Sequence, residues 1–315
     1  MNDFTENVFD ELVRNKVSVN SAKQYITFLR RINGSKDYKD LDFLNDFGEI
    51  MKYLDKYSKN TKLTYLSGIV KITSLFPKKK EIHAKYKAKL KELLEEKKKV
   101  NPNIKTEKEK NNWVNWDEIV DVRNKLKTEI DNQSKSSVML EKGWKQQMQY
   151  LLLNLFTRFP PRRNADYHYM RIVKETPKGF VMDKNRNYYF VDRNKMIFNN
   201  YKTAKTHGPQ VYSLDNKPKL VSVLKNYIKI HPLTANNEFN MLVSDTGKTM
   251  ESTNAITRLL NSVVKKYLGK DKNVGSTMLR HSYITDKYKK VDKDREEEAA
   301  AMGHTVAMSR QYVKL

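Results

Sequence analysis

The sequence contains no cysteine among its 315 residues. Disulfide bonds, thiolate nucleophiles and cysteine-based zinc sites are therefore excluded, and the fold needs no particular redox compartment. No apolar run approaches the roughly 20 residues that a membrane-spanning helix needs. The N-terminal residues have neither the basic start nor the apolar stretch of a signal peptide. We therefore expect an intracellular protein with no membrane partner.

Acidic residues are scarce beside basic ones. The chain has 61 Lys+Arg and 37 Asp+Glu, a formal net charge of +24 and a pI near 9.7. A field of that sign attracts polyanions, which favours a nucleic acid over the alternative of an ordinary solvated lysine surface; the motifs described below make double-stranded DNA the expected partner. The acidic residues show no trio typical of a magnesium site, and the histidines outside the C-terminal stretch lack ligand spacing. We expect no metal and no cofactor.

The first hundred residues show apolar positions at intervals of three and four, which predicts amphipathic helices. The predicted helices cover residues 19–32, 41–54, 60–76 and 78–99. A charged segment near residues 100–112, containing Pro102, is typical of a linker. The sequence therefore predicts a helical domain at 1–105 and a second domain at 113–315. In the last of these helices, four alternating lysines could follow a DNA backbone or form a solvated surface: Lys85, Lys87, Lys89 and Lys91.

The second domain is predicted to be mainly α with a small antiparallel β-sheet, an α+β fold. A helix at 139–156, nearly all apolar toward its end, is expected to be its buried core element. Other helices are predicted at 116–130, 220–230, 252–268, 276–288 and 295–302. Short strands are predicted at 179–182, 188–192, 196–201 and 210–214.

Paired arginines follow the predicted core helix. Arg162 and Arg163 come directly after two prolines, which must end the helix and hold the arginines close to the core. Arg162 is a further candidate for DNA contact. Two lysines, Lys202 and Lys205, lie between the last two predicted strands, where a hairpin tip is expected.

The last 40 residues contain three groups that can act on a phosphodiester: Arg280, His304 and Tyr312. Cleavage without metal needs an in-line nucleophile, cations on the nonbridging oxygens and an acid for the leaving oxygen. A guanidinium can bind two phosphate oxygens at once, and a phenol can form a phosphotyrosyl ester that keeps the bond energy for rejoining. The pattern points to DNA strand cleavage and rejoining.

Four sequence elements resemble those of the tyrosine recombinase, or phage integrase, family. The family's Arg-x-x-Glu/Asp-x-x-x-Leu is similar to the segment from Arg163 to Met170, and its hairpin lysine to Lys202 or Lys205. Its His-x-Leu-Arg-His resembles the stretch from Thr277 to His281. Its Leu-Gly-His followed by a tyrosine resembles Met302-Gly303-His304 and Tyr312. The order and approximate spacing of all four match over residues 110–315, and the N-terminal part is compatible with the family's SAM-like core-DNA-binding domain.

The resemblance implies a site-specific recombinase that integrates a mobile or viral element through a 3′-phosphotyrosyl intermediate, working as a tetramer on DNA. By position, Arg163 and Arg280 bind the scissile phosphate, His304 hydrogen-bonds it and Tyr312 is the nucleophile. Lys202 protonates the leaving oxygen, with Lys205 as the alternative. Asp166 and His281 are expected to support the site.

Two departures from the family pattern leave alternatives open. Thr277 stands where the family has a histidine, and loss of a general base typically costs about 10²–10⁴ in rate. The sequence also ends three residues after Tyr312, where the family often continues into a helix that contacts a neighbouring protomer. A type IB topoisomerase and a catalytically weakened DNA-binding protein on the same fold are the alternatives.

Overall fold

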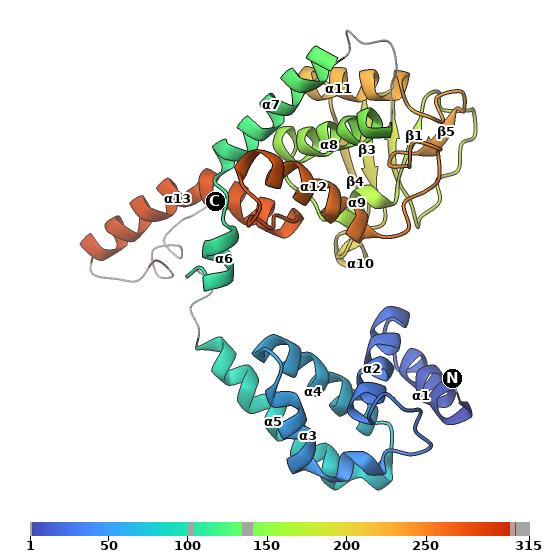
Figure 1. Ribbon diagram of the computed structural model, residues 1–315, viewed down its shortest axis with the longest axis vertical. Helices are drawn as coiled ribbons and strands as arrows, with labels where there is room; N and C mark the ends of the chain where they lie inside the picture. The colour runs from blue at the N-terminus through green and yellow to red at the C-terminus, as the bar shows by residue number, and fades with distance from the viewer. Residues whose placement is uncertain (1, 100–103, 134–140, 303–305, 307–315) are drawn as a thin grey trace. The chain divides into compact units, whose positions relative to one another are not determined.

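The computed structural model describes residues 2–99, 104–133, 141–302 and 306. The chain divides into two compact units, Met1–Ile104 and Lys105–Leu315 (Figure 1). A DNA-binding role for the first unit and a catalytic role for the second stay predictions. No helix in the described part of the chain is long and apolar enough to cross a membrane.

The first unit is helical. Its α-helices are α1 (Asp3–Arg14), α2 (Val19–Ile32), α3 (Phe47–Asp55), α4 (Lys59–Thr73) and α5 (Lys80–Lys98). Helix α4 packs against α2 and α5, and its Leu66 and Ile69 are fully buried. Helix α1 was not predicted. The helix predicted at 41–54 is divided into a 3₁₀ turn (Asp42–Asn45) and the separate helix α3, whose N-cap residue Asp46 accepts a hydrogen bond from the Glu49 N–H.

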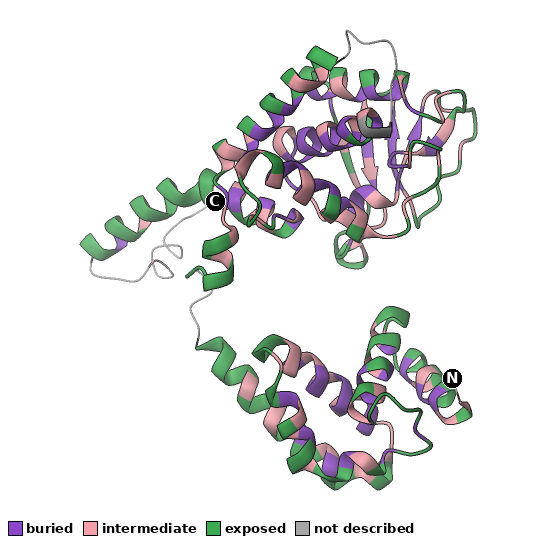
Figure 2. Cartoon of the chain, viewed as in Figure 1, coloured by how far each residue is buried: buried purple, intermediate pink, exposed green. Residues whose placement is uncertain are grey.

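The second unit is organised around a buried helix, α8 (Glu141–Arg158), as the sequence predicted. Its residues Leu151, Leu152, Leu153, Leu155 and Phe156 are fully inaccessible to solvent, and the helix is largely purple in Figure 2. Helices α7 (Trp116–Gln133), α11 (Pro218–Lys229) and α12 (Thr253–Leu268) pack on it. The remaining helices are α6 (Glu107–Asn112), α9 (Asn164–His168), α10 (Ala204–His207) and α13 (Ser276–Ala301).

The second unit contains a five-stranded sheet of order β4-β3-β2-β1-β5. Its strands are β1 (Met170–Val173), β2 (Asn187–Phe190), β3 (Lys195–Phe198), β4 (Gln210–Ser213) and β5 (Glu238–Asn240). The pairs β2–β3, β3–β4 and β1–β5 are antiparallel, whereas β1 and β2 are parallel. The fold class is therefore confirmed as mainly helical α+β, but the small sheet is mixed and not wholly antiparallel.

Several predicted elements differ from the structure. The strand predicted at 179–182 is wrong: this segment is a loop, with Val181 87% exposed and Gly179 at φ +77°. The break predicted between residues 288 and 295 is absent, because that stretch has no proline or glycine and α13 runs through it. Part of the predicted linker forms α6, which a reciprocal capping box between Thr106 and Glu109 stabilises.

Candidate active site

The turn between α8 and α9 carries the paired arginines. Pro160 and Pro161 follow the end of α8, and Arg163 is the N-cap residue of α9 with extended backbone angles. Because the prolines prevent the helix from continuing, the chain turns sharply here. Arg163 is half-buried and leads directly into a short helix whose Asp166 and Tyr167 are buried.

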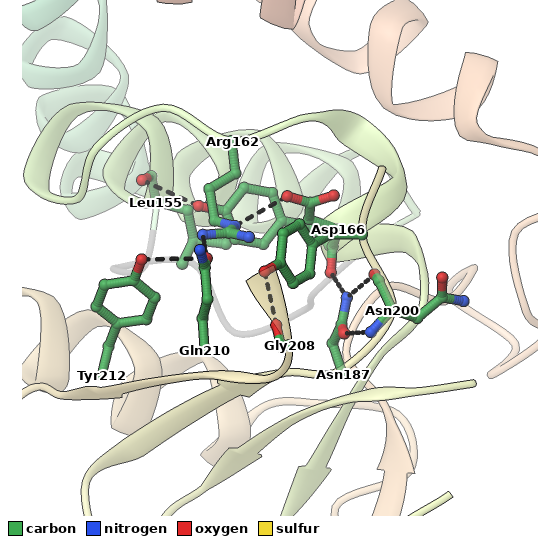
Figure 3. Close-up of polar contacts among 10 residues, drawn as sticks. Leu155, Arg162, Asp166, Asn187, Asn200, Gly208, Gln210 and Tyr212 are labelled. Carbon is green, nitrogen blue, oxygen red and sulfur yellow. Dashed lines mark hydrogen bonds and ion pairs between the residues drawn. The ribbon is translucent and has the colours of Figure 1, made fainter. Parts of the chain in front are cut away.

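Arg162 points into the protein. Its Nε lies 2.8 Å from Asp166 Oδ2, and its Nη1 donates a hydrogen bond of 2.9 Å to Gln210 Oε1 on β4 (Figure 3). Its guanidinium carbon also lies 3.8 Å from the ring centroid of Phe198, a cation–π contact. Arg162 therefore braces the turn against the sheet, and its predicted DNA contact stays a prediction.

Asn187 connects this turn to the hairpin that carries the candidate lysines. Its Nδ2 donates to the carbonyl oxygens of Asp166 and Asn200, at 2.7 and 2.9 Å, and its Oδ1 accepts from the Asn200 N–H (Figure 3). The residue is fully buried. A network in which every polar atom has a partner fixes relative position well, so Asn187 holds the segment before Lys202 against α9.

The hairpin β3–β4 was predicted correctly, and its connection contains α10. The Tyr201 hydroxyl donates a 2.6 Å hydrogen bond to the Gly208 carbonyl, which closes the connection at its base. Lys202 lies in the turn before α10 and Lys205 within α10. Both lysines are exposed. The choice between them as general acid stays open.

Arg280, on the second turn of α13, lies within electrostatic reach of the arginine turn. Burial is the main cause that lowers its pKa, and the positive charge of Arg163 is the next; Asp166 acts in the opposite direction, and Arg162 lowers the pKa further. The structure thus brings Arg163, Arg280 and Asp166 together from segments more than 100 residues apart. Three arginines thus lie within electrostatic reach of one carboxylate, and the excess of positive charge suits an anion.

Asp166 is the acidic member of this group. Its side chain is 4% exposed, and burial raises its pKa while the charges of Arg162 and Arg163 oppose that rise. Oδ2 is bonded to Arg162, whereas the buried Oδ1 has no hydrogen-bond partner among the described residues. An unpaired buried acceptor is costly.

Thr277 and His281 lie on the first two turns of α13. Both are exposed. Residues four apart share a helix face. The charge of His281 contributes to lowering the pKa of Glu109, after two hydrogen bonds from Thr106, so His281 lies near α6. The supporting role of His281 and the effect of Thr277 in place of the family's histidine stay predictions. His304 and Tyr312 lie outside the described residues.

The four lysines of α5 do not share one face. Residues two apart on an α-helix point in nearly opposite directions, so Lys85 and Lys89 lie on one flank of α5 and Lys87 and Lys91 on the other. Lys89 forms an ion pair of 2.6 Å with Glu92. One face of α5 can therefore present only two of the four lysines to a DNA backbone, and the DNA contact of each lysine stays a prediction.

Gln210 and Asn187 position the site and were not identified from the sequence. Asn187 did leave a signal, because it is a polar residue at the start of a strand otherwise made of Tyr188, Tyr189 and Phe190. Gln210 left no such signal in the sequence, because glutamine is common in edge strands. No cluster of three metal-ligating side chains occurs among the residues that the structure describes.

Comparison with known proteins gives little. No family model and no curated protein matches the sequence. One solved structure similar to the chain is that of XerA recombinase, with 14% sequence identity and a TM-score of 0.35, covering 100% of this chain and 94% of the other. At that identity and TM-score, the similarity assigns neither a family nor a function.

Proposed function

We propose that the protein is a site-specific tyrosine recombinase that cleaves and rejoins DNA strands. The observation that carries the proposal is the convergence of Arg163 and Arg280 beside the buried Asp166. Like charges repel, so two guanidinium groups lie close together at a cost unless an anion binds them. A phosphodiester suits two planar forks, each able to donate two parallel hydrogen bonds.

In this proposal, the Tyr312 phenol oxygen attacks phosphorus and the bond to the 5′ oxygen breaks. The phenol proton passes to solvent water, since Thr277 is no base, and a hairpin lysine protonates the departing 5′ oxygen. Arg163 and Arg280 stabilise the charge that develops on the nonbridging oxygens. The product is a 3′-phosphotyrosyl ester, which a 5′ hydroxyl can reverse or exchange without ATP. Integration of a mobile or viral element by a tetramer is the process that this chemistry would serve.

The support for the hairpin lysine is the network around Asn187, which ties the arginine turn to the residues just before Lys202. Exposed lysines on a connection of this kind can approach a leaving oxygen from the solvent side. The sequence spacing of His304 and Tyr312 from Arg280 supports their roles.

The test begins with the DNA site, which can be selected from a random pool by binding. A duplex with that site and a nick near the cleavage position should trap a covalent protein–DNA adduct, because the short flanking strand diffuses away. We expect an adduct with the parent protein and none with Tyr312→Phe. An adduct with Tyr312→Phe would identify a different nucleophile. Relaxation of supercoiled plasmid without recombinant product would favour a topoisomerase, and binding without any adduct a DNA-binding protein.

A further inference from the structure

Helix α12 packs against α9, the short helix whose N-cap residue is Arg163 (Figure 1). Asn164, the residue after Arg163, donates hydrogen bonds from its Nδ2 to α12. One of 2.8 Å goes to Thr257 Oγ1, and a longer one of 3.4 Å goes to the carbonyl oxygen of Thr253. The backbone that carries Arg163 is therefore tied to α12 at the next residue in the chain.

The same face of α12 also holds the segment that leads into α13. Asn261 follows Thr257 by four residues, so the two side chains share a face of the helix. Asn261 Oδ1 accepts a hydrogen bond of 2.5 Å from the Val274 N–H. Gly275, the N-cap residue of α13, lies beside the Thr257 methyl group, since a Cβ added at Gly275 would be 3.7 Å from Thr257 Cγ2. Thr257 thus bonds Asn164 through its hydroxyl and contacts Gly275 through its methyl group.

Arg280 is connected to this contact through the first turns of α13. It lies five residues after Gly275 in the same helix. Val274, just before the helix, is fully buried, and so is Leu279, the neighbour of Arg280, at 1% exposed. Because buried side chains at both ends fix this short stretch, the position of Val274 and Gly275 determines that of Arg280. One helix, α12, therefore joins the two segments that carry Arg163 and Arg280.

We propose that Thr257 and Asn261 are positioning residues that set the spacing of Arg163 and Arg280 for binding one phosphate group. Two planar guanidinium groups can both bind one phosphate only when their separation and orientation match it. A displacement of about 1 Å at a reacting centre can cost about 10²-fold in rate. The inference rests on the proposed function, from which it takes phosphate as the ligand of the two arginines. It adds a requirement on α12, which carries neither arginine.

Removing either tie to α12 should slow cleavage. Thr257→Val keeps the shape of the side chain but takes away the hydroxyl that accepts from Asn164. Asn261→Leu takes away the acceptor of the Val274 N–H. For each variant we expect adduct formation on the nicked duplex, at saturating DNA, to slow by about 10–10²-fold. Thr257→Ser keeps the hydroxyl and should cleave at the parental rate.

The matched control is a substitution on the same helix that removes a hydrogen bond directed elsewhere. Ser262 Oγ accepts a hydrogen bond of 2.6 Å from Gln149 on α8. Ser262→Ala removes this bond without touching either segment that carries an arginine, so it should cleave at the parental rate. Circular dichroism at the assay temperature should show that all variants are folded.

A double-mutant cycle distinguishes positioning from a general loss of stability. Arg280→Lys already removes the planar group that Thr257 positions, so adding Thr257→Val should slow cleavage little further. Residues that act independently would instead give losses that multiply. The proposal is overturned by losses that multiply, by a parental rate in Thr257→Val or Asn261→Leu, by a slow Thr257→Ser, or by an equal loss in Ser262→Ala.

Binding of inorganic phosphate tests the same spacing without cleavage. Isothermal titration of the full-length protein with orthophosphate should show weaker binding in Arg280→Lys and in Thr257→Val, and no further weakening in the double variant. This result in a protein that forms no adduct keeps the positioning role and removes the proposed cleavage. Adduct formation with losses that multiply keeps the cleavage and overturns the positioning role. Phosphate binding that Arg280→Lys leaves unchanged, together with no adduct, overturns both.

Discussion

Arg162 and Asp166 form an ion pair of 2.8 Å in which the two side chains are only 12% and 4% exposed. Arg163 lies between these two residues in the sequence and is the N-cap residue of α9. Arg162 is held a second time by Gln210 on β4. The turn that carries Arg163, the candidate phosphate-binding residue, is therefore held by a buried ion pair that is hydrogen-bonded to the sheet.

Removing Asp166 should destabilise the protein strongly. Asp166→Ala leaves the Arg162 guanidinium buried without its carboxylate, and breaking a buried pair in this way costs about 3–5 kcal/mol. Urea unfolding followed by circular dichroism measures the loss. The control is Asp183→Ala, whose partner Arg186 lies 3.9 Å away at the surface and for which we expect a change of about 0–1 kcal/mol. Similar losses in the two variants would mean that the Arg162 pair does not support the turn.

Replacing either site arginine by lysine should slow cleavage while leaving the fold intact. Lysine keeps the charge but cannot bind two phosphate oxygens through a planar fork. For Arg163→Lys and Arg280→Lys we expect adduct formation on the nicked duplex to slow by about 10²–10³, the usual cost of losing one transition-state donor. Arg186→Lys, in the loop before β2, should cleave at the parental rate. An unchanged rate in Arg163→Lys would remove that residue from the phosphate site.

The general acid can be identified by changing the leaving group. A 5′ thiolate leaves without a proton, whereas a 5′ alkoxide needs an acid. We expect one of Lys202→Ala and Lys205→Ala to cleave the ordinary substrate about 10²–10⁴ more slowly and to recover on a substrate with sulfur at the bridging 5′ position. The other variant serves as the control, because it should cleave both substrates at the parental rate. Loss of rate in both variants without recovery would mean that neither lysine is the acid.

Local periodicity predicted most of the helices. Helix α2, with apolar residues such as Ile26 and Leu29 at intervals of three and four, was predicted within a residue of its bounds. The hairpin β3–β4 was predicted because its strands are adjacent in the sequence. Two features could not be predicted: the parallel pairing of β1 with β2 and the three-residue strand β5. Both depend on contacts between distant segments, which a local sequence pattern does not record.

The candidate site was likewise predicted only in part. Arg163 and Arg280 were predicted from their motifs; the structure places them within electrostatic reach of each other, and their role at a phosphate stays a prediction. The burial of Arg162 on the Phe198 ring was not foreseen, because an arginine in a basic pair looks like a surface residue until the tertiary fold covers it. The lysines of α5 lie on a helix that the sequence predicted, helical geometry divides them between two flanks, and their DNA contact stays a prediction.

Gly68→Ala should be destabilising even though alanine favours helices. The new Cβ would lie 2.8 Å from Tyr25 Cδ1, so the Tyr25 ring or α4 must move. Overpacking of this kind costs about 1–3 kcal/mol, more than the gain of roughly 1 kcal/mol in helix propensity. Gly48→Ala in α3 is the control, since its Cβ would meet nothing closer than Asp46 Oδ1 at 3.7 Å. Urea unfolding should show a loss for Gly68→Ala alone, and equal stability of the two variants would contradict the close approach.

His231 should make the second unit sensitive to acid. The side chain is 1% exposed, its Nδ1 accepts a hydrogen bond from the Leu233 N–H, and burial lowers its pKa from 6.5 to about 4. The folded state therefore keeps the imidazole neutral, while the unfolded chain takes up a proton near pH 6.5. Stability is retained above pH 6.5 and is lost as the pH falls toward 4, by up to about 3 kcal/mol at 1.4 kcal/mol per pH unit.

Chemical unfolding at a series of pH values between 7 and 4 tests this dependence. Other groups also titrate in this range, so the informative quantity is the difference between the parent protein and His231→Leu. The variant loses the bond to Leu233 at every pH, which gives a constant offset, but it has no imidazole to protonate. The difference in free energy of unfolding should therefore shift in favour of His231→Leu as the pH falls. His207→Leu, which removes an exposed histidine, should run parallel to the parent protein; a parallel course for His231→Leu as well would contradict a neutral buried imidazole.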